Sequence, residues 1–190
     1  MIKTLSSKLH RISPGWTAGL TTALFLLFLI LVLPRQASAS QARTGDLPSP
    51  DTSLIYAPQE LYRLAGEYGP EARKAYIQAR FTFDLLFPLV YGSFLATTLS
   101  WVSRRVLPEG SGWLRINLIP GTAVLFDFLE NTSTSLVMGL YPRRLPGVNH
   151  LAPAFTALKW TTLGLSFALF LGGLAVLLWK AFRDSQKSPT

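Results

Sequence analysis

The chain has no cysteine and only two histidines, and these absences remove several classes of site. Without cysteine there can be no disulfides, no thiolate metal ligands and no thiol redox chemistry. His10 and His150 both lie outside the long apolar runs, so a zinc or di-iron site built on histidine is not expected inside those runs. We therefore expect neither a metal nor a cofactor.

Charged residues are also scarce, at 15% of the chain, whereas hydrophobic residues make up 49%. The hydrophobic residues are gathered into long runs instead of being spread at the spacing of a soluble core, which is typical of a membrane protein. Four runs are long enough to cross a bilayer, and they cover about residues 16–33, 81–102, 118–140 and 153–179. No segment between them is long enough for a soluble domain, so residues 1–190 are predicted to form a single integral membrane domain.

The predicted fold class is all-α, a polytopic membrane protein built as a bundle of four transmembrane helices with a short external amphipathic helix. Nine Lys and Arg residues lie in short segments on one side of this bundle, which places both termini in the cytoplasm. The opposite side carries Arg143, Arg144 and a long loop, and the charges of a long loop have less influence on membrane orientation. The net charge of +8 is thus explained by membrane orientation, and no nucleic-acid partner is expected.

The first apolar run has two interpretations. A basic N-terminus, an apolar run and the sequence Ala37-Ser38-Ala39 are typical of a signal peptide cleaved after Ala39. The basic region and the apolar run are both long for a signal peptide, which favours an uncleaved signal anchor. Cleavage would leave three spans in the same orientation.

The external segment between the first two runs is predicted to change character along its length. Residues 34–57 are rich in Ser, Ala, Pro and Thr without periodicity, which predicts a flexible linker. Pro58 to Tyr68 then fits a short amphipathic helix that either lies on the outer leaflet or caps the bundle. Gly69 ends this helix, and Pro70 begins the next, which is predicted to continue through Arg80 into the membrane.

The third run carries ionisable residues where a membrane-spanning helix normally has few. Asp127, Glu130 and Asn131 are three and four positions apart, so on a helix their side chains share one face. Carboxylates near the middle of a bilayer are costly unless they are paired, hydrated or protonated. An intramembrane site is therefore the default hypothesis for this run.

Two other runs place charges at a similar depth. Arg80 and Asp84 are four residues apart at the outer boundary of the second run and are predicted to pair, and Tyr91 continues their face inward. Lys159 lies near the N-terminus of the fourth span, where the helix dipole disfavours a cation, so we expect it to pair with an acid of the second or third span. The candidate ligand-binding cluster is Arg80, Asp84, Tyr91, Asp127, Glu130, Asn131 and Lys159.

Three motifs occur in successive spans: Asp-x-x-x-Pro at Asp84, Asp-x-x-Glu-Asn at Asp127 and Leu-Lys at Lys159. This combination resembles a group of small, uncharacterised multi-pass proteins of the bacterial inner membrane. The resemblance covers about residues 58–180, and Asp-x-x-Glu-Asn is its most specific part. It implies a bacterial cytoplasmic-membrane protein with the same polar positions, and it implies no established activity.

Three functions remain open at this point. The first is an outward-facing intramembrane site for a small polar or cationic ligand, a proton or a lipid headgroup. The second is a structural or accessory subunit that pairs with a membrane partner. A stripe of small residues that could form a close-packing surface, Gly164, Ala168 and Gly172, is predicted to pack within the bundle. The third is an intramembrane enzyme acting on a lipid. Paired carboxylates outside any recognised catalytic pattern are a weak enzymatic signal, so a non-enzymatic role is favoured.

Overall fold

The computed structural model describes residues 1–44, 47–50 and 53–186, and 86% of the structure is helix. The all-α fold class is confirmed. Three helical stretches are long and apolar enough to cross a membrane, and they are Gly15–Thr44, Pro58–Val106 and Val148–Ser185. The predicted third span also forms a helix. Its polar residues lower its mean hydropathy, so it is not among these three stretches.

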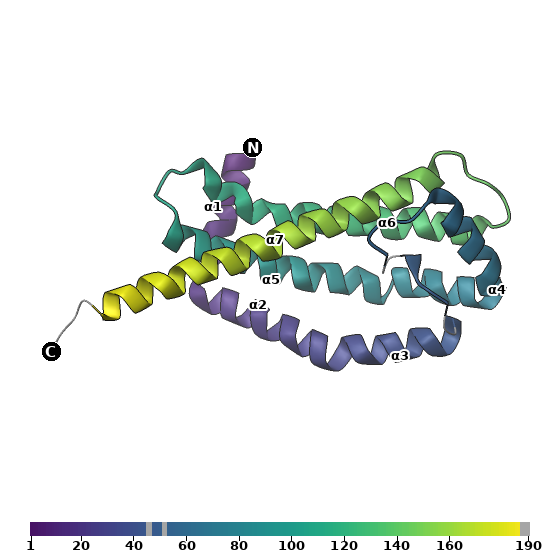
Figure 1. The fold of residues 1–190 in the computed structure, drawn as a ribbon, viewed down its shortest axis with the longest axis horizontal. Coiled ribbons are helices and arrows are strands. Elements are labelled where there is room, and N and C mark those ends of the chain that lie inside the picture. Colours follow the sequence, from purple (N-terminus) through teal and green to yellow (C-terminus); the bar gives the residue numbers. More distant parts are fainter. Residues whose placement is uncertain (45–46, 51–52, 187–190) are drawn as a thin grey trace.

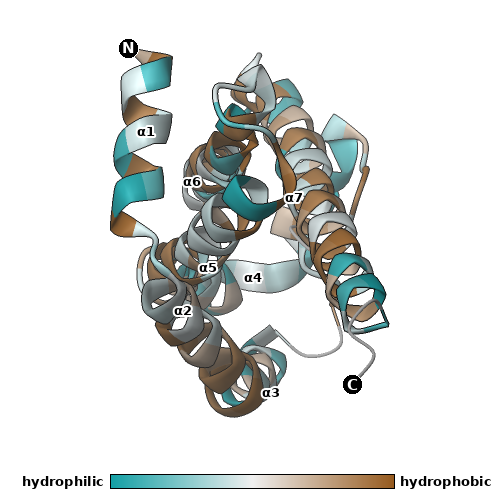
Figure 2. Ribbon diagram, turned by 90° about the vertical axis from the view of Figure 1, so that its left-hand side faces the viewer, coloured by the Kyte–Doolittle hydropathy of each residue, from teal (hydrophilic) through white to brown (hydrophobic). Residues whose placement is uncertain are grey.

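The helices follow one another in this order: α1 (Ile2–Ile12), α2 (Gly15–Leu27), the π-helical segment η1 (Phe28–Val32), α3 (Leu33–Thr44), α4 (Pro58–Arg80), α5 (Phe83–Val106), the 3-10 segment η3 (Gly112–Leu118), α6 (Ile119–Leu140) and α7 (Val148–Ser185). Helices α5, α6 and α7 run along the long axis of the molecule, with α2 and α3 on the other side of α5 from α7 (Figure 1). The N-terminal helix α1 and the end of α7 lie at the same end of the bundle (Figure 1). Seen along that axis, α5 and α6 lie between α2 and α7 (Figure 2).

The first apolar run continues as helix well beyond its predicted end. Helix α3 extends to Thr44, so the prediction of a flexible linker from residue 34 is wrong over this segment. Ala, Gln and Arg are good helix formers, and they extend a helix that the apolar run has already begun. Residues 53–57 are irregular, as predicted, and positions 45–46 and 51–52 of that linker lie outside the described residues.

A π-helical segment interrupts this stretch just before Pro34. The N–H of Leu33 bonds to the carbonyl of Phe28, five residues earlier. Proline has no N–H to continue the α-helical pattern, and the wider turn accommodates this loss.

Helix α4 is two helices joined at Gly69, as the sequence predicts. Gly69 has φ 67° and ψ 171°, a conformation open to glycine, and Pro70 begins the second half. The first half buries Leu61 and Ala65 in a core that includes Met138 of α6. It therefore caps the bundle, which decides between the two placements that the sequence left open.

The predicted continuous helix from Pro70 through Arg80 into the second span is wrong. A turn at Phe81 and Thr82 separates α4 from α5. The Thr82 hydroxyl donates to the carbonyl of Gln78 at 2.8 Å, a local bond that competes with helix continuation.

The small-residue stripe of α7 also differs from the prediction. Gly164, Ala168 and Gly172 are exposed instead of packed within the bundle. It is Gly173, one residue further on, that lies against Val102 of α5. The rotation of α7 about its axis decides which glycine faces α5, and the sequence of α7 alone does not give that rotation.

Candidate functional site

A buried ion pair joins α6 to α7. Lys159 Nζ lies 2.5 Å from Glu130 Oε2, and the hydroxyl of Thr156 donates to Glu130 Oε1 at 2.7 Å. Glu130 is 0% exposed and Lys159 is 6% exposed. The predicted pairing of Lys159 with an acid of a neighbouring span is therefore confirmed, and Glu130 is that acid.

A second polar link joins α5 to α6. The hydroxyl of Tyr91 donates to Asp127 Oδ2 at 2.9 Å, and Asn131 Nδ2 donates to Asp127 Oδ1 at 3.0 Å. The same amide lies 3.3 Å from the backbone carbonyl of Asp84. These bonds fix the orientation of the Asp127 carboxylate, because each of its oxygens has a buried donor.

The third polar contact bridges the turn between α4 and α5. Arg80 Nε lies 3.2 Å from Asp84 Oδ2, which confirms the predicted pair. The guanidinium also lies over the ring of Tyr76, 4.5 Å from its centre. The ion pair and the cation–π contact together hold Arg80 in place although the helix is broken beside it.

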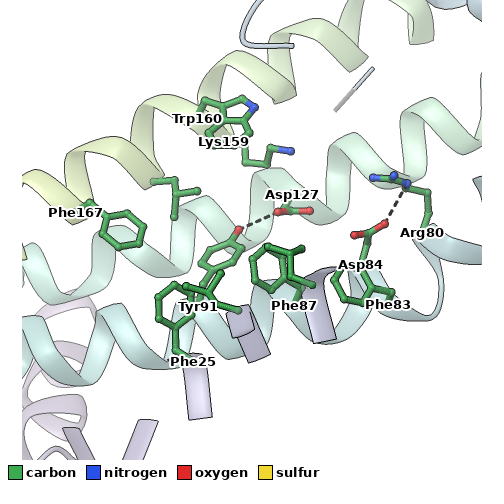
Figure 3. A pocket seen from close by; sticks show the side chains of 13 residues that line it. Phe25, Arg80, Phe83, Asp84, Phe87, Tyr91, Asp127, Lys159, Trp160 and Phe167 are labelled. Atoms are coloured by element: carbon green, nitrogen blue, oxygen red, sulfur yellow. Dashed lines mark hydrogen bonds and ion pairs between the residues drawn. The ribbon is translucent and has the colours of Figure 1, made fainter. Parts of the chain in front are cut away.

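These contacts surround a cavity of about 560 Å³ over α5, between α2–α3 on one side and α7 on the other (Figure 3). Its lining comes from the six helices α2 to α7 and from η1: Phe25, Leu29, Leu33, Arg80, Phe83, Asp84, Phe87, Tyr91, Asp127, Lys159, Trp160, Leu163 and Phe167. Arg80 and Asp84 lie in the part of the cavity toward α4 with Phe83 beside them, Asp127 and Lys159 lie nearer its middle, and Phe25 and Phe167 lie at the opposite end. The cavity thus has a polar part and an aromatic part.

The predicted cluster divides into two groups. Five of its members line the cavity, and they are Arg80, Asp84, Tyr91, Asp127 and Lys159. Glu130 and Asn131 do not line it, and they instead hold Lys159 and Asp127 through the contacts above. The three-and-four spacing on α6 correctly placed Asp127, Glu130 and Asn131 together in the interior, where all three are buried.

The aromatic wall was not predicted. Phe83, Phe87 and Tyr91 are four residues apart, which is a visible stripe on α5, and their neighbouring rings lie 5.8 Å and 5.5 Å apart. Phe25 comes from the first span and stacks on Phe94 at 4.5 Å. No pattern in the sequence links that span to this wall.

The π-helical segment η1 contributes Leu29 to the same wall. Such segments inside α-helices are frequent at functional sites, because the widened turn displaces side chains from their regular positions. In this chain it directs part of the first span toward the cavity. Cleavage of the first span would remove Phe25, Leu29 and Leu33 from the lining and leave the aromatic residues of α5.

The site offers charge and hydrogen bonding instead of a metal centre. Within the described part of the chain, no three His, Asp or Glu side chains are grouped so that they could hold a metal ion. The lining carries two carboxyl groups, Asp84 and Asp127, and two cations, of which Arg80 faces Asp84 and Lys159 faces Glu130 behind the lining. Hydrogen-bond donors and cations are thus the groups that this polar part is best suited to receive.

Comparisons with known proteins add no relative. No protein-family model matches the chain, and no curated protein and no solved structure matches it either. Function is therefore inferred from the site itself.

Proposed function

We propose that this chain is a multi-pass membrane protein with four spans, whose cavity binds an amphiphilic molecule. The apolar tail of that molecule lies among the aromatic side chains. Its head group is a hydroxyl or an amine that meets Asp127. The observation that carries the proposal is the division of one cavity into a charged part and an aromatic part.

Four spans with both termini cytoplasmic agree with the course of the chain. Helix α6 has 22 residues, enough to cross a hydrocarbon core, and its polar residues face the interior of the bundle. Helix α1 and the end of α7 lie at the same end of the bundle, as an even number of spans requires (Figure 1). Three exposed tryptophans have the positions of an aromatic belt at the cytoplasmic interface. Trp16 lies at the start of α2, Trp113 lies in η3, and Trp179 lies near the end of α7.

The composition of the lining favours an amphiphile over a small polar solute or a bare ion. Eight of the thirteen lining residues are Phe, Leu or Trp, which bind hydrocarbon and contribute no ligands to an ion. A volume of about 560 Å³ is also far larger than one ion or one water requires. A tailed molecule uses both parts of the cavity.

The head group follows from the carboxylates. Asp127 accepts one bond from Tyr91 and one from Asn131, and an ionised carboxylate has about four acceptor sites in all. Because Asp127 also lines the cavity, we expect a ligand hydroxyl or ammonium to bond to its carboxylate. A carboxylate or phosphate head would instead meet Asp127 and Asp84 as like charges, and the two cations of the lining, Arg80 and Lys159, already face Asp84 and Glu130.

The binding test uses the full-length protein in detergent micelles and a dansyl-labelled long-chain amine, with dodecanol and dodecanoate as competitors. We expect saturable binding that the alcohol displaces and the carboxylate does not. Asp127→Asn should weaken amine binding about ten- to a hundredfold, the value of one hydrogen bond to a charged group. Asp184→Asn, an exposed acid at the end of α7, is the matched control and should bind like the unaltered protein.

A second variant separates loss of binding from loss of fold. Leu163→Trp fills the aromatic part of the cavity and alters no charged residue. It should abolish binding while the helical content stays unchanged by circular dichroism. Equal displacement by dodecanoate and dodecanol, or full binding by Leu163→Trp, would contradict the proposal.

One observation favours a second candidate, an accessory subunit that packs on another membrane protein. The stripe Gly164, Ala168 and Gly172 is exposed on α7, and small residues allow close approach of a second helix. Replacing Gly172 by Leu should then break co-purification with a membrane partner, whereas the equally exposed Gly19→Leu on α2 should not. Identical co-purifying proteins in both variants would exclude this role for the stripe.

A further inference from the structure

Helix α1 buries two polar side chains against the protein and leaves large apolar side chains exposed. Ser6 and His10 are buried, whereas Ile2, Leu5 and Ile12 are 62%, 58% and 61% exposed. A surface helix of a soluble protein has the opposite arrangement. The outward face of α1 is therefore suited to lipid.

Polar contacts hold the inner face of α1 in place. The Ser6 hydroxyl donates to Asn117 Oδ1 at 2.9 Å. The two ring nitrogens of His10 lie 3.1 Å from the carbonyl oxygen of Ser100 and 3.0 Å from that of Leu114. These bonds fix α1 against α5 and η3, so its apolar face has a defined position.

The orientation of α1 agrees with a place at the membrane interface. It lies across the direction of α5, α6 and α7, at the end of the bundle where α7 ends (Figure 1). Helices that lie in the interface plane carry Lys and Arg on one face and large apolar residues on the other. Lys3, Lys8 and Arg11 supply the basic residues, and α1 contains no acid.

A groove of about 680 Å³ lies between α1 and the start of α6. Its walls are mainly aliphatic, with Leu5 and Leu9 from α1 and Leu118 and Ile119 from the other side. Gly121 also lines the groove, and no atom lies within 4 Å of the position a Cβ would take there. The groove has the lining that an acyl chain requires.

The charged side chains in the groove are of one sign. Lys8 and Arg115 line it, and no acid does so among the residues that the structure describes. They come from different elements, α1 and η3, and both are exposed. A guanidinium and an ammonium together match a phosphate, since the guanidinium can bind two of its oxygens.

We propose that this groove is a binding site for an anionic phospholipid of the adjacent leaflet. One acyl chain lies along Leu5, Leu9 and Ile119, and the phosphate lies between Lys8 and Arg115. This site is separate from the cavity of the proposed function and does not depend on it. The bound lipid holds α1 at the membrane surface, next to the ends of α5 and α6.

The test is native mass spectrometry of the full-length protein with dioleoyl phosphatidylglycerol, dioleoyl phosphatidylcholine or glycerol phosphate added. We expect phosphatidylglycerol to bind at least tenfold more tightly than phosphatidylcholine, and glycerol phosphate not to be retained. The double variant Lys8→Gln/Arg115→Gln should weaken phosphatidylglycerol binding about 30-fold, because each basic residue near an anionic lipid surface contributes about one kcal/mol.

Two matched controls make the result specific to the groove. Lys3→Gln/Arg11→Gln removes the same charge from outside the groove lining and should retain most of the binding. Gly121→Leu should block the acyl chain without altering charge, whereas Gly164→Leu, an equally open glycine on α7, should not. Equal loss in the two charge variants, full binding by Gly121→Leu, or equal binding of the two lipids would overturn the proposal. Retention of glycerol phosphate would also overturn it, by assigning the site to a free phosphate.

Discussion

Replacing Lys159 by Met should destabilise the protein more than any other single charge removal on α7. The substitution keeps the length of the side chain and removes only the ammonium, 2.5 Å from Glu130 Oε2. The Glu130 carboxyl group is fully buried and loses the ammonium of Lys159, while the Thr156 hydroxyl still donates to it. Breaking a buried pair in this way costs about 3–5 kcal/mol.

The assay is unfolding of the purified protein by SDS in mixed micelles, followed by circular dichroism. Lys180→Met is the matched control, because Lys180 is an exposed lysine of the same helix. Its substitution should change the free energy of unfolding by no more than about 0.5 kcal/mol. If Lys159→Met proved as harmless as Lys180→Met, the buried ion pair would have no energetic role and this reasoning would be refuted.

The double variant Lys159→Met/Glu130→Gln separates structure from function. Removing the buried carboxylate as well should recover about 1–3 kcal/mol of the loss, the size of coupling seen between contacting groups. If Lys159 serves only to join α6 to α7, amine binding should return together with stability. If Lys159 also holds the ligand, stability should return while binding stays weak, because Lys159 lines the cavity and Glu130 does not.

Two further predictions concern the backbone and α1. Gly69→Ala should cost about 1–3 kcal/mol in the same assay, because only glycine adopts its φ of 67° and ψ of 171° without strain. The control Gly19→Ala, in a helix with no neighbour near the added Cβ, should be neutral or stabilising, and equal effects of the two would argue against a strained Gly69. His10→Ala should release α1 and raise the rate of maleimide labelling at Ser6→Cys about tenfold or more, since the contacts of the His10 ring with the backbone of Ser100 and Leu114 are lost. Labelling at exposed Ser7→Cys should stay unchanged, and an unchanged rate at Ser6→Cys would show that His10 does not hold α1.

Spacing within one helix allowed part of the site to be predicted from the sequence. The shared face of Asp127, Glu130 and Asn131 depends only on helical periodicity, whereas Arg80 and Asp84 pair across the turn that separates α4 from α5. The stop at Gly69 followed from the conformational freedom of glycine and from the proline after it. Each of these predictions needs information from a few neighbouring residues.

Contacts between helices could not be predicted in the same way. Lys159 had three candidate acids, and the rotation of α7 against α6 selects Glu130. Phe25 enters the cavity because α2 packs on α5, and nothing in its own neighbourhood indicates this. The break at Thr82 depends on a hydroxyl bonding to the backbone, which in other helices occurs without a break.

The central claim is that the cavity holds an amphiphile through its polar and aromatic parts. The most direct measurement is mass spectrometric identification of the molecules that co-purify with the full-length protein in a mild detergent. We predict that one amphiphile with a hydroxyl or amine head co-purifies in stoichiometric amount with the unaltered protein. The same amphiphile should co-purify with Leu171→Trp, because Leu171 is exposed and lies outside the cavity. It should be lost from Leu163→Trp, because Leu163 lines the cavity. The same molecules in equal amounts in all three proteins would contradict the claim.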